Sequence, residues 1–227
     1  MRHLLSNNYE HSELINSLLN TIADKDTSVE EYRSSFYSIG KELGIIIKDL
    51  LPNKYNETTL LACASEDADW LADGFLHGLG DTMLPLAVFW GIRERLSNGI
   101  DVTSIVRTYK DDLKSECKNL IIIKSIISSS CVVKTQLLRL ISDITPKNIY
   151  IIAPVMYKDA AHNLSMDFPK DISSKFKFIT FAVDDEINEN KEIIPGIGGM
   201  VYPRLGLGTE VEKNSYIPEI VKNRMIQ

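Results

Sequence analysis

Hydrophobic residues follow two spacings along this chain, and together they predict helices followed by a sheet. Near the N-terminus, apolar residues recur at every third or fourth position over residues 11–23, and again after Thr27 or Ser28, either of which can cap a second helix. Beyond a turn at residues 52–57, apolar runs of strand length predict strands at residues 59–64, 86–90, 119–127, 147–155 and 176–183.

The stretch from residue 119 to residue 155 predicts how that sheet is built. Its first strand is a run of branched apolar residues, typical of a buried parallel strand, and a serine loop at 128–130 leads into a helix over residues 131–143. With the strand that follows, this is a βαβ unit, whose crossover is right-handed in nearly all proteins. Ligands bind such sheets at the carboxyl ends of the strands. We expect an α/β core over residues 58–227, preceded by a helical arm over residues 1–57.

The composition is that of a globular protein and argues against several classes of function. A net charge of -6 disfavours binding to nucleic-acid phosphates. The three cysteines, Cys63, Cys117 and Cys131, lack the close pairing of a zinc site or a disulfide framework. No apolar run reaches the length of a membrane span, and the N-terminus lacks the apolar segment of a signal peptide. We therefore expect a cytoplasmic protein that binds neither membrane nor nucleic acid.

A glycine-rich stretch, residues 183–209, carries the most specific pattern. Glycines let a backbone approach a ligand closely, although a long surface loop is the alternative on composition alone. The stretch resembles the uracil-binding signature of the uracil phosphoribosyltransferases at Asp184, Ile187, Asn188, Glu189, Asn190, Ile193, Ile194, Pro195, Gly196, Ile197 and Gly198. That family reads the pyrimidine ring there, largely with main-chain groups. The resemblance implies substrate contacts from Asp184, Ile194, Pro195, Gly196, Ile197, Gly198 and Gly199.

The resemblance extends to the N-terminal part of the chain. Residues 24–33, DKDTSVEEYR, are similar to an arm that these enzymes carry between their first two helices. The resemblance implies a Rossmann-like type I phosphoribosyltransferase core with a mainly parallel central sheet, an N-terminal helical arm and a homodimer. Mg²⁺ and phosphoribosyl diphosphate are implied only if the transferase activity is retained.

The chain departs from this family where the family holds phosphate and ribose. An acidic pair, Glu66 and Asp67, stands where the family has Arg-Ala-Gly, and at roughly 4 Å each such charge repels a diphosphate charge by about 4 kcal/mol. In the family's ribose-phosphate loop, the aspartate is Ser125 here and the two glycines are Cys131 and Val132. Residual anion binding at the helix start is expected from Ser128, Ser129, Ser130 and Lys134.

Three residues are candidates for catalysis. Cys131 begins a helix, where a thiol can have a lowered pKa and act as a nucleophile, although a small buried apolar residue is the alternative. Ser130 lies in the loop before Cys131, and Asp67 lies in the acidic stretch after the first predicted strand. These two residues are the other candidates.

Acidic residues after the first predicted strand are the only weak candidates for a metal. Glu66 and Asp69 are the carboxylates considered, and Asp73 shares a helix face with His77, four residues later. A solvated helix start, stabilised by the helix dipole, is the alternative for this cluster.

Three functions follow from the resemblance and its departures. The first is an enzyme that has lost nucleotide synthesis from phosphoribosyl diphosphate and acts on another small molecule in the same pocket. The second is a non-catalytic protein that binds a nucleobase or nucleotide. The third is an active but divergent uracil phosphoribosyltransferase.

Overall fold

The computed structural model is an α/β protein with one large sheet, and it describes residues 1–51, 55–95, 97, 101–189 and 192–226. The sheet runs in the order β1-β8-β7-β5-β2-β3-β4, and β6 also pairs with β7. Its strands are β1 (Arg2–Leu4), β2 (Thr59–Ala64), β3 (Leu86–Arg95), β4 (Asp101–Lys110), β5 (Asn119–Ile123), β6 (Ile126–Ile127), β7 (Asn148–Tyr157) and β8 (Phe176–Asp184). The five central strands from β8 to β3 are mutually parallel, whereas β1 and β4 pair antiparallel at the edges. The mainly parallel α/β architecture expected from the sequence is thus confirmed.

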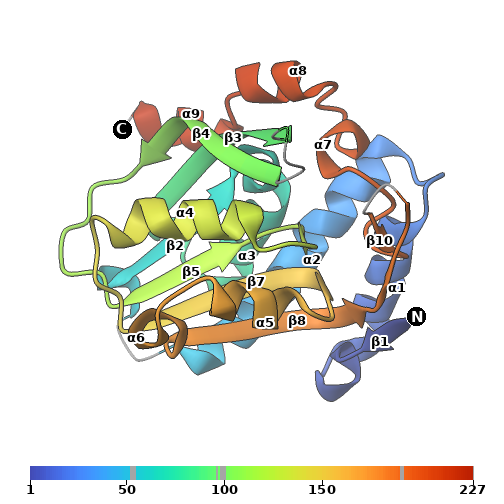
Figure 1. The fold of residues 1–227 in the computed structure, drawn as a ribbon, viewed down its shortest axis with the longest axis horizontal. Coiled ribbons are helices and arrows are strands. Elements are labelled where there is room, and N and C mark those ends of the chain that lie inside the picture. Colours follow the sequence, from blue (N-terminus) through green and yellow to red (C-terminus); the bar gives the residue numbers. More distant parts are fainter. Residues whose placement is uncertain (52–54, 96, 98–100, 190–191, 227) are drawn as a thin grey trace.

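Helices cover both faces of this sheet (Figure 1). They are α1 (Ser12–Ala23), α2 (Val29–Leu50), α3 (Asp73–Leu79), α4 (Cys131–Ile141), α5 (Ala160–Met166), α6 (Lys170–Ser173), α7 (Val201–Arg204), α8 (Glu210–Ser215) and α9 (Glu219–Met225). Short helical turns occupy Ser6–Asn8, Tyr55–Glu57, Ser65–Asp67 and Ala68–Ala72, and a small hairpin pairs β9 (Glu186–Ile187) with β10 (Ile193–Ile194). No helix in the described part of the chain is long and apolar enough to cross a membrane.

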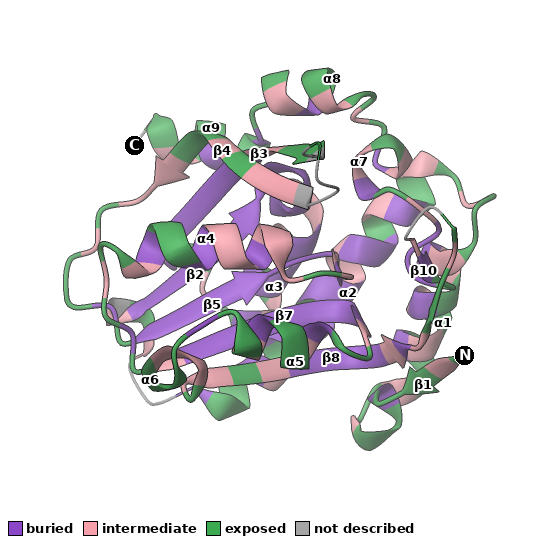
Figure 2. Cartoon of the chain, in the orientation of Figure 1, coloured by how far each residue is buried: buried purple, intermediate pink, exposed green. Residues whose placement is uncertain are grey.

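The predicted βαβ unit is present, with β5 and β7 adjacent and parallel and α4 as the crossover. Both faces of these strands are covered, so their residues are buried on either side (Figure 2). Their sequences are therefore continuously apolar, which allowed the strands to be predicted. One core cluster joins the sheet to α1, α2 and α3, and the other joins it to α4 and α5. Ser28 caps α2, where its side chain accepts a hydrogen bond from the Glu31 N–H.

Four glycines allow α2 and α3 to pack closely. A Cβ atom on Gly40 would lie 2.2 Å from the Leu71 carbonyl oxygen, and one on Gly74 would lie 2.0 Å from the Tyr37 carbonyl oxygen. Gly44 and Gly78, one turn further along each helix, meet backbone in the same way. The two helices therefore interlock through their backbones on one face of the sheet.

Several segments differ from the sequence prediction. The run at 119–127 is two strands, because the chain leaves the ladder at Lys124 and Ser125. The polar stretch after Arg93 forms β4, and the polar stretch after Tyr157 contains α5 and α6. Residues 52–54 of the predicted turn, and Asn190 of the glycine-rich stretch, lie outside the described residues. The division of the chain at residue 57 stays a prediction, while α1 and α2 contribute to a core shared with the sheet.

A buried ion pair ties the N-terminus to the end of β8. The Asp184 side chain is fully buried and accepts two hydrogen bonds of 2.8 Å from Arg2, one from Nε and one from Nη2. It also accepts a hydrogen bond of 2.9 Å from the Gly196 N–H. One carboxylate therefore joins β1, β8 and the glycine-rich loop.

We predict that Asp184→Asn lowers the free energy of unfolding by about 3–5 kcal/mol, because it leaves the buried Arg2 guanidinium without its counterion. Urea unfolding of the two proteins measures this difference. Asp185→Asn is the matched control, since Asp185 pairs with the exposed N-terminal ammonium at the surface. Equal, small effects of both substitutions would contradict the assignment.

Candidate functional site

A pocket of about 930 Å³ opens at the carboxyl ends of β2 and β5. Its walls come from the β3–β4 hairpin, the start of α4, Ile187, residues 192–202 and α8, which surround this end of the sheet (Figure 1). Apolar side chains from all of these elements except α8 line it: Phe89, Val102, Ile105, Ile126, Val132, Ile187, Ile193, Ile197, Met200 and Val201. The position agrees with the general rule that parallel sheets bind ligands at this edge.

Two of the residues expected from the resemblance, Ile197 and Gly199, line this pocket. The Gly196 N–H is bonded to Asp184, the Gly196 carbonyl accepts a 2.6 Å hydrogen bond from Arg2, and the Ile197 carbonyl accepts one of 2.8 Å from the Tyr32 hydroxyl. Asp184 is therefore occupied in holding the loop. Ile194, Pro195, Gly196 and Gly198 shape the same loop but are not among the described lining residues.

Glycine is required in this loop for steric reasons. Gly196 has φ +56°, and a Cβ there would lie 2.3 Å from the Ile193 carbonyl oxygen. Gly198 has φ +72°, and a Cβ there would lie 2.9 Å from the Ile22 carbonyl oxygen in α1. The left-handed backbone and the close approach to α1 both favour a residue without a side chain.

A buried lysine forms the charged floor of the pocket. The Lys124 Nζ lies 2.6 Å from Asp67 Oδ2 and 3.3 Å from Glu66 Oε1, and it donates a hydrogen bond of 3.1 Å to Ser125 Oγ. Burial alone would lower the pKa of this ammonium, but the two carboxylates outweigh it, so the Lys124 pKa lies above its ordinary value. The side chains of Lys124 and Asp67 are 3% and 1% exposed, so this is an internal ion pair.

The C-terminal segment supplies a second buried cation that sequence reasoning missed. Lys213 on α8 donates a 2.7 Å hydrogen bond to the Gly91 carbonyl oxygen, and its Nζ lies 3.8 Å from Glu66 Oε2. Asp69 holds the same segment by accepting hydrogen bonds from the Glu219 and Ile220 N–H groups and from the Tyr216 hydroxyl. Only the spacing of these partners, about 150 residues apart in sequence, hid them from a local reading.

The weak metal candidates do not form a site. Glu66 is engaged by two lysines and Asp69 caps the C-terminal segment. His77 Nδ1 lies 3.5 Å from Asp73 Oδ1 on the exposed side of α3. Within the residues that the structure describes, no group of three or more His, Cys, Asp or Glu side chains is arranged to hold a metal ion.

The predicted anion site at the start of α4 is divided. Ser128 and Ser129 line the pocket, whereas Ser130 and Lys134 are bonded to Asp167, which follows α5. The Ser130 hydroxyl donates a 2.5 Å hydrogen bond to Asp167 Oδ2, and Lys134 Nζ lies 2.9 Å from Asp167 Oδ1. The Asp167 carboxylate thus binds two of the groups that were expected to bind a phosphate.

The three catalytic candidates belong to separate hydrogen-bonded groups. Asp67 is bonded to Lys124, and Ser130 is bonded to Asp167. The half-buried Cys131 lines the pocket, and its Sγ lies 3.3 Å from Thr103 Oγ1 on β4. The structure does not bring these three side chains together as one constellation among the described residues.

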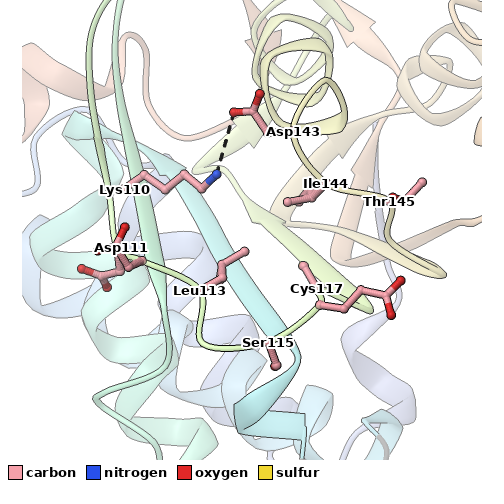
Figure 3. Close-up of a pocket in the computed structure, with 10 residues that line it drawn as sticks. Lys110, Asp111, Leu113, Ser115, Cys117, Asp143, Ile144 and Thr145 are labelled. Carbon is pink, nitrogen blue, oxygen red and sulfur yellow. Dashed lines mark ion pairs between the residues drawn. The ribbon is translucent and has the colours of Figure 1, made fainter.

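A smaller hollow of about 430 Å³ lies beside the start of β5, at the other end of that strand from the larger pocket (Figure 3). It is bounded by the end of β4, the start of β5 and the turn after α4, and Lys110 lies 3.8 Å from Asp143 across it. Several other carboxylates line it, including Asp111, Asp112 and Glu116. None of the residues expected to bind a ligand lies there.

Comparison with known proteins gives likenesses of fold. No family model matches the sequence, and a search of curated proteins finds no match. The chain is similar to the structure of the AQ2163 protein from Aquifex aeolicus, with a TM-score of 0.68 and 17% identity over 87% of this chain and 95% of that one. At this identity the similarity shows a shared fold alone.

Two phosphoribosyltransferases of known structure are also similar to the chain. Adenine phosphoribosyltransferase from Leishmania donovani matches with a TM-score of 0.47 and 12% identity, over 82% of this chain and 84% of that one. Orotate phosphoribosyltransferase from Mycobacterium tuberculosis, solved with 5-phospho-α-D-ribosyl 1-diphosphate, matches with a TM-score of 0.44 and 10% identity, over 78% of this chain and 95% of that one. Membership of the uracil-specific family stays a prediction.

We predict that Asp167→Ala creates an anion site that the wild-type chain lacks, because it frees Ser130 and Lys134 at the start of α4. Inorganic phosphate should then raise the thermal midpoint of the variant but not that of the wild type. Asp159→Ala is the control, because it removes the same charge at the other end of α5. A phosphate response of the wild type equal to that of the variant would contradict the blocking role.

Proposed function

We propose that this chain binds an uncharged, nucleobase-like ring molecule in the 930 Å³ pocket and has given up nucleotide synthesis from phosphoribosyl diphosphate. The observation that carries the proposal is the charge of the pocket. Three cationic side chains line it, Arg93, Lys124 and Lys213, against four carboxylates, Glu66, Glu94, Glu192 and Glu210. No excess of positive charge is present among these residues to balance a diphosphate.

The buried cations are also already neutralised. Lys124 is paired with Asp67 and Glu66, and Lys213 with Glu66 and the Gly91 carbonyl. Drawing either lysine toward a phosphate would leave a carboxylate buried without its partner, which costs several kcal/mol. The apolar walls provide the opposite condition, because an uncharged ring loses little hydration there and gains contact area.

The backbone around Gly199 supports a planar ligand. A Cβ built on Gly199 meets no atom within 4 Å, so this part of the loop adjoins open space. The residue lines the pocket beside Ile197 and Tyr202. A flat molecule can therefore lie against bare main chain here, as the resemblance to the uracil enzymes implies.

An enzyme acting on another small molecule is the second candidate, and the position of Cys131 supports it. The thiol is the nucleophilic side chain at the start of α4 that also lines the pocket. In this case Cys131→Ser retains ring binding but abolishes turnover. Equal turnover by the two proteins would exclude the thiol as nucleophile.

A homodimer and a cytoplasmic location also remain predictions. Light scattering tests the homodimer.

We predict that uracil stabilises the wild-type chain, while phosphoribosyl diphosphate with Mg²⁺ does not. A ligand at about 100 times its dissociation constant adds about 2.7 kcal/mol to the free energy of unfolding, which a thermal-shift assay detects. Val132→Trp should weaken the response, because its indole takes up part of the pocket beside α4. Leu138→Trp on the exposed side of the same helix is the control and should respond as the wild type does.

The opposite pattern would overturn the proposal. Stabilisation by phosphoribosyl diphosphate that depends on Mg²⁺ would restore the active transferase. No response to uracil, with an unchanged control variant, would remove the ring-binding site.

A further inference from the structure

The α4 wall of the pocket carries a buried amide, that of Gln136. Gln136 on α4 is 2% exposed and lines the pocket, and its Oε1 is buried without a partner within the described parts of the chain. Buried polar groups are almost always hydrogen-bonded, because a group removed from water without compensation costs free energy. An exception that adjoins a cavity calls for a functional explanation.

The surroundings of Gln136 make it the available polar group of this wall. It follows Val132 by one helical turn, so the two side chains face the same side of α4. The neighbouring Thr135 hydroxyl lies within hydrogen-bond distance of the Cys131 and Thr103 carbonyl oxygens, at 3.0 and 3.3 Å. Phe89 and Ile105 of the β3–β4 hairpin line the same pocket and offer no polar side-chain atom, whereas Arg93, Glu94 and Thr103 of that hairpin do.

A carboxamide carries both donors and an acceptor on one flat group. The neutral group that complements both is another amide, in which an N–H and a C=O lie side by side on one edge. A charged group would find no counterion among the residues of α4 that line the pocket beside Gln136, because Val132 and Thr135 are uncharged. An apolar group would leave the amide of Gln136 unpaired.

We infer that Gln136 is a specificity-determining residue, and that the ligand presents a cyclic amide, or lactam, edge to α4 between Val132 and the β3–β4 hairpin. This inference rests on the proposed function, since it names the chemical class of molecule that the pocket takes. The pocket has room for such a molecule, because 930 Å³ lies near the upper end of the range for pockets that hold drug-sized ligands.

The first test needs no ligand. Gln136→Leu keeps the volume similar and removes the unpaired amide, so it should raise Tm by about 2–4 °C. Asn119→Leu is the matched control, because Asn119 is also a buried amide, but it donates to Thr59 at 3.2 Å and accepts from Asn148 at 3.0 Å. The control should lower Tm. A fall in Tm for both variants would overturn the inference, because it would show that Gln136 is bonded within the protein.

The second test uses quinolin-2-one, a two-ring lactam, and its N-methyl derivative, which lacks the N–H. The wild type should bind the lactam at least about tenfold more tightly than the N-methyl compound, and Gln136→Leu should bind both equally weakly. Equal binding of both compounds by wild type and variant would overturn the inference and leave the proposed ring-binding function intact. No binding of the lactam to the wild type would also overturn it, and the uracil response would then decide the proposed function separately.

Discussion

The ion pair between Lys124 and Asp67 holds together the end of the sheet at which the pocket lies. Lys124, at the carboxyl end of a central parallel strand, is almost fully buried, so its ammonium requires carboxylates within hydrogen-bond distance. Asp67 and Glu66 supply them from the turn after β2, and the Ser125 hydroxyl oxygen accepts a further hydrogen bond from the ammonium. The pair therefore joins the ends of β2 and β5, and through Lys213 it also draws in α8.

Similar pairing holds two other aspartates near the site, the buried Asp184 and the more exposed Asp167. Asp184 is satisfied by Arg2 and the Gly196 N–H, and Asp167 by Ser130 and Lys134. In each case a group with the chemistry to bind a charged ligand is used to hold the fold instead. A polyanionic ligand that recruited these groups would have to break contacts that they already make. On our proposal, the cavity that remains takes an uncharged molecule.

Sequence patterns predicted the parts of the fold that depend on local spacing. Apolar runs within one stretch of sequence predicted the strands β2 and β7, and helical spacing of apolar residues predicted the helices α1, α2 and α4. The edge strands β1 and β4 contain many polar residues and form strands by pairing with a neighbouring strand. The spacing of apolar residues therefore did not predict them. The candidate site divides in the same way. The sequence pattern predicted a loop that depends on the glycines at 196 and 198. It did not predict the roles of Lys124, Asp167 and Lys213, because these depend on partners distant in sequence.

Retention of a fold and retention of an activity place different demands on a chain. The fold needs covered sheet faces and paired buried charges, and both are present here. Phosphoribosyl transfer needs charges left unpaired until the substrate arrives, because such preorganised groups stabilise the transition state. Here the cations that the structure describes around Ser125 and Ser130 are already paired, while Gln136, a neutral group, is left without a partner. On our proposal, the ligand therefore meets an unpaired hydrogen-bonding group at this wall of the pocket.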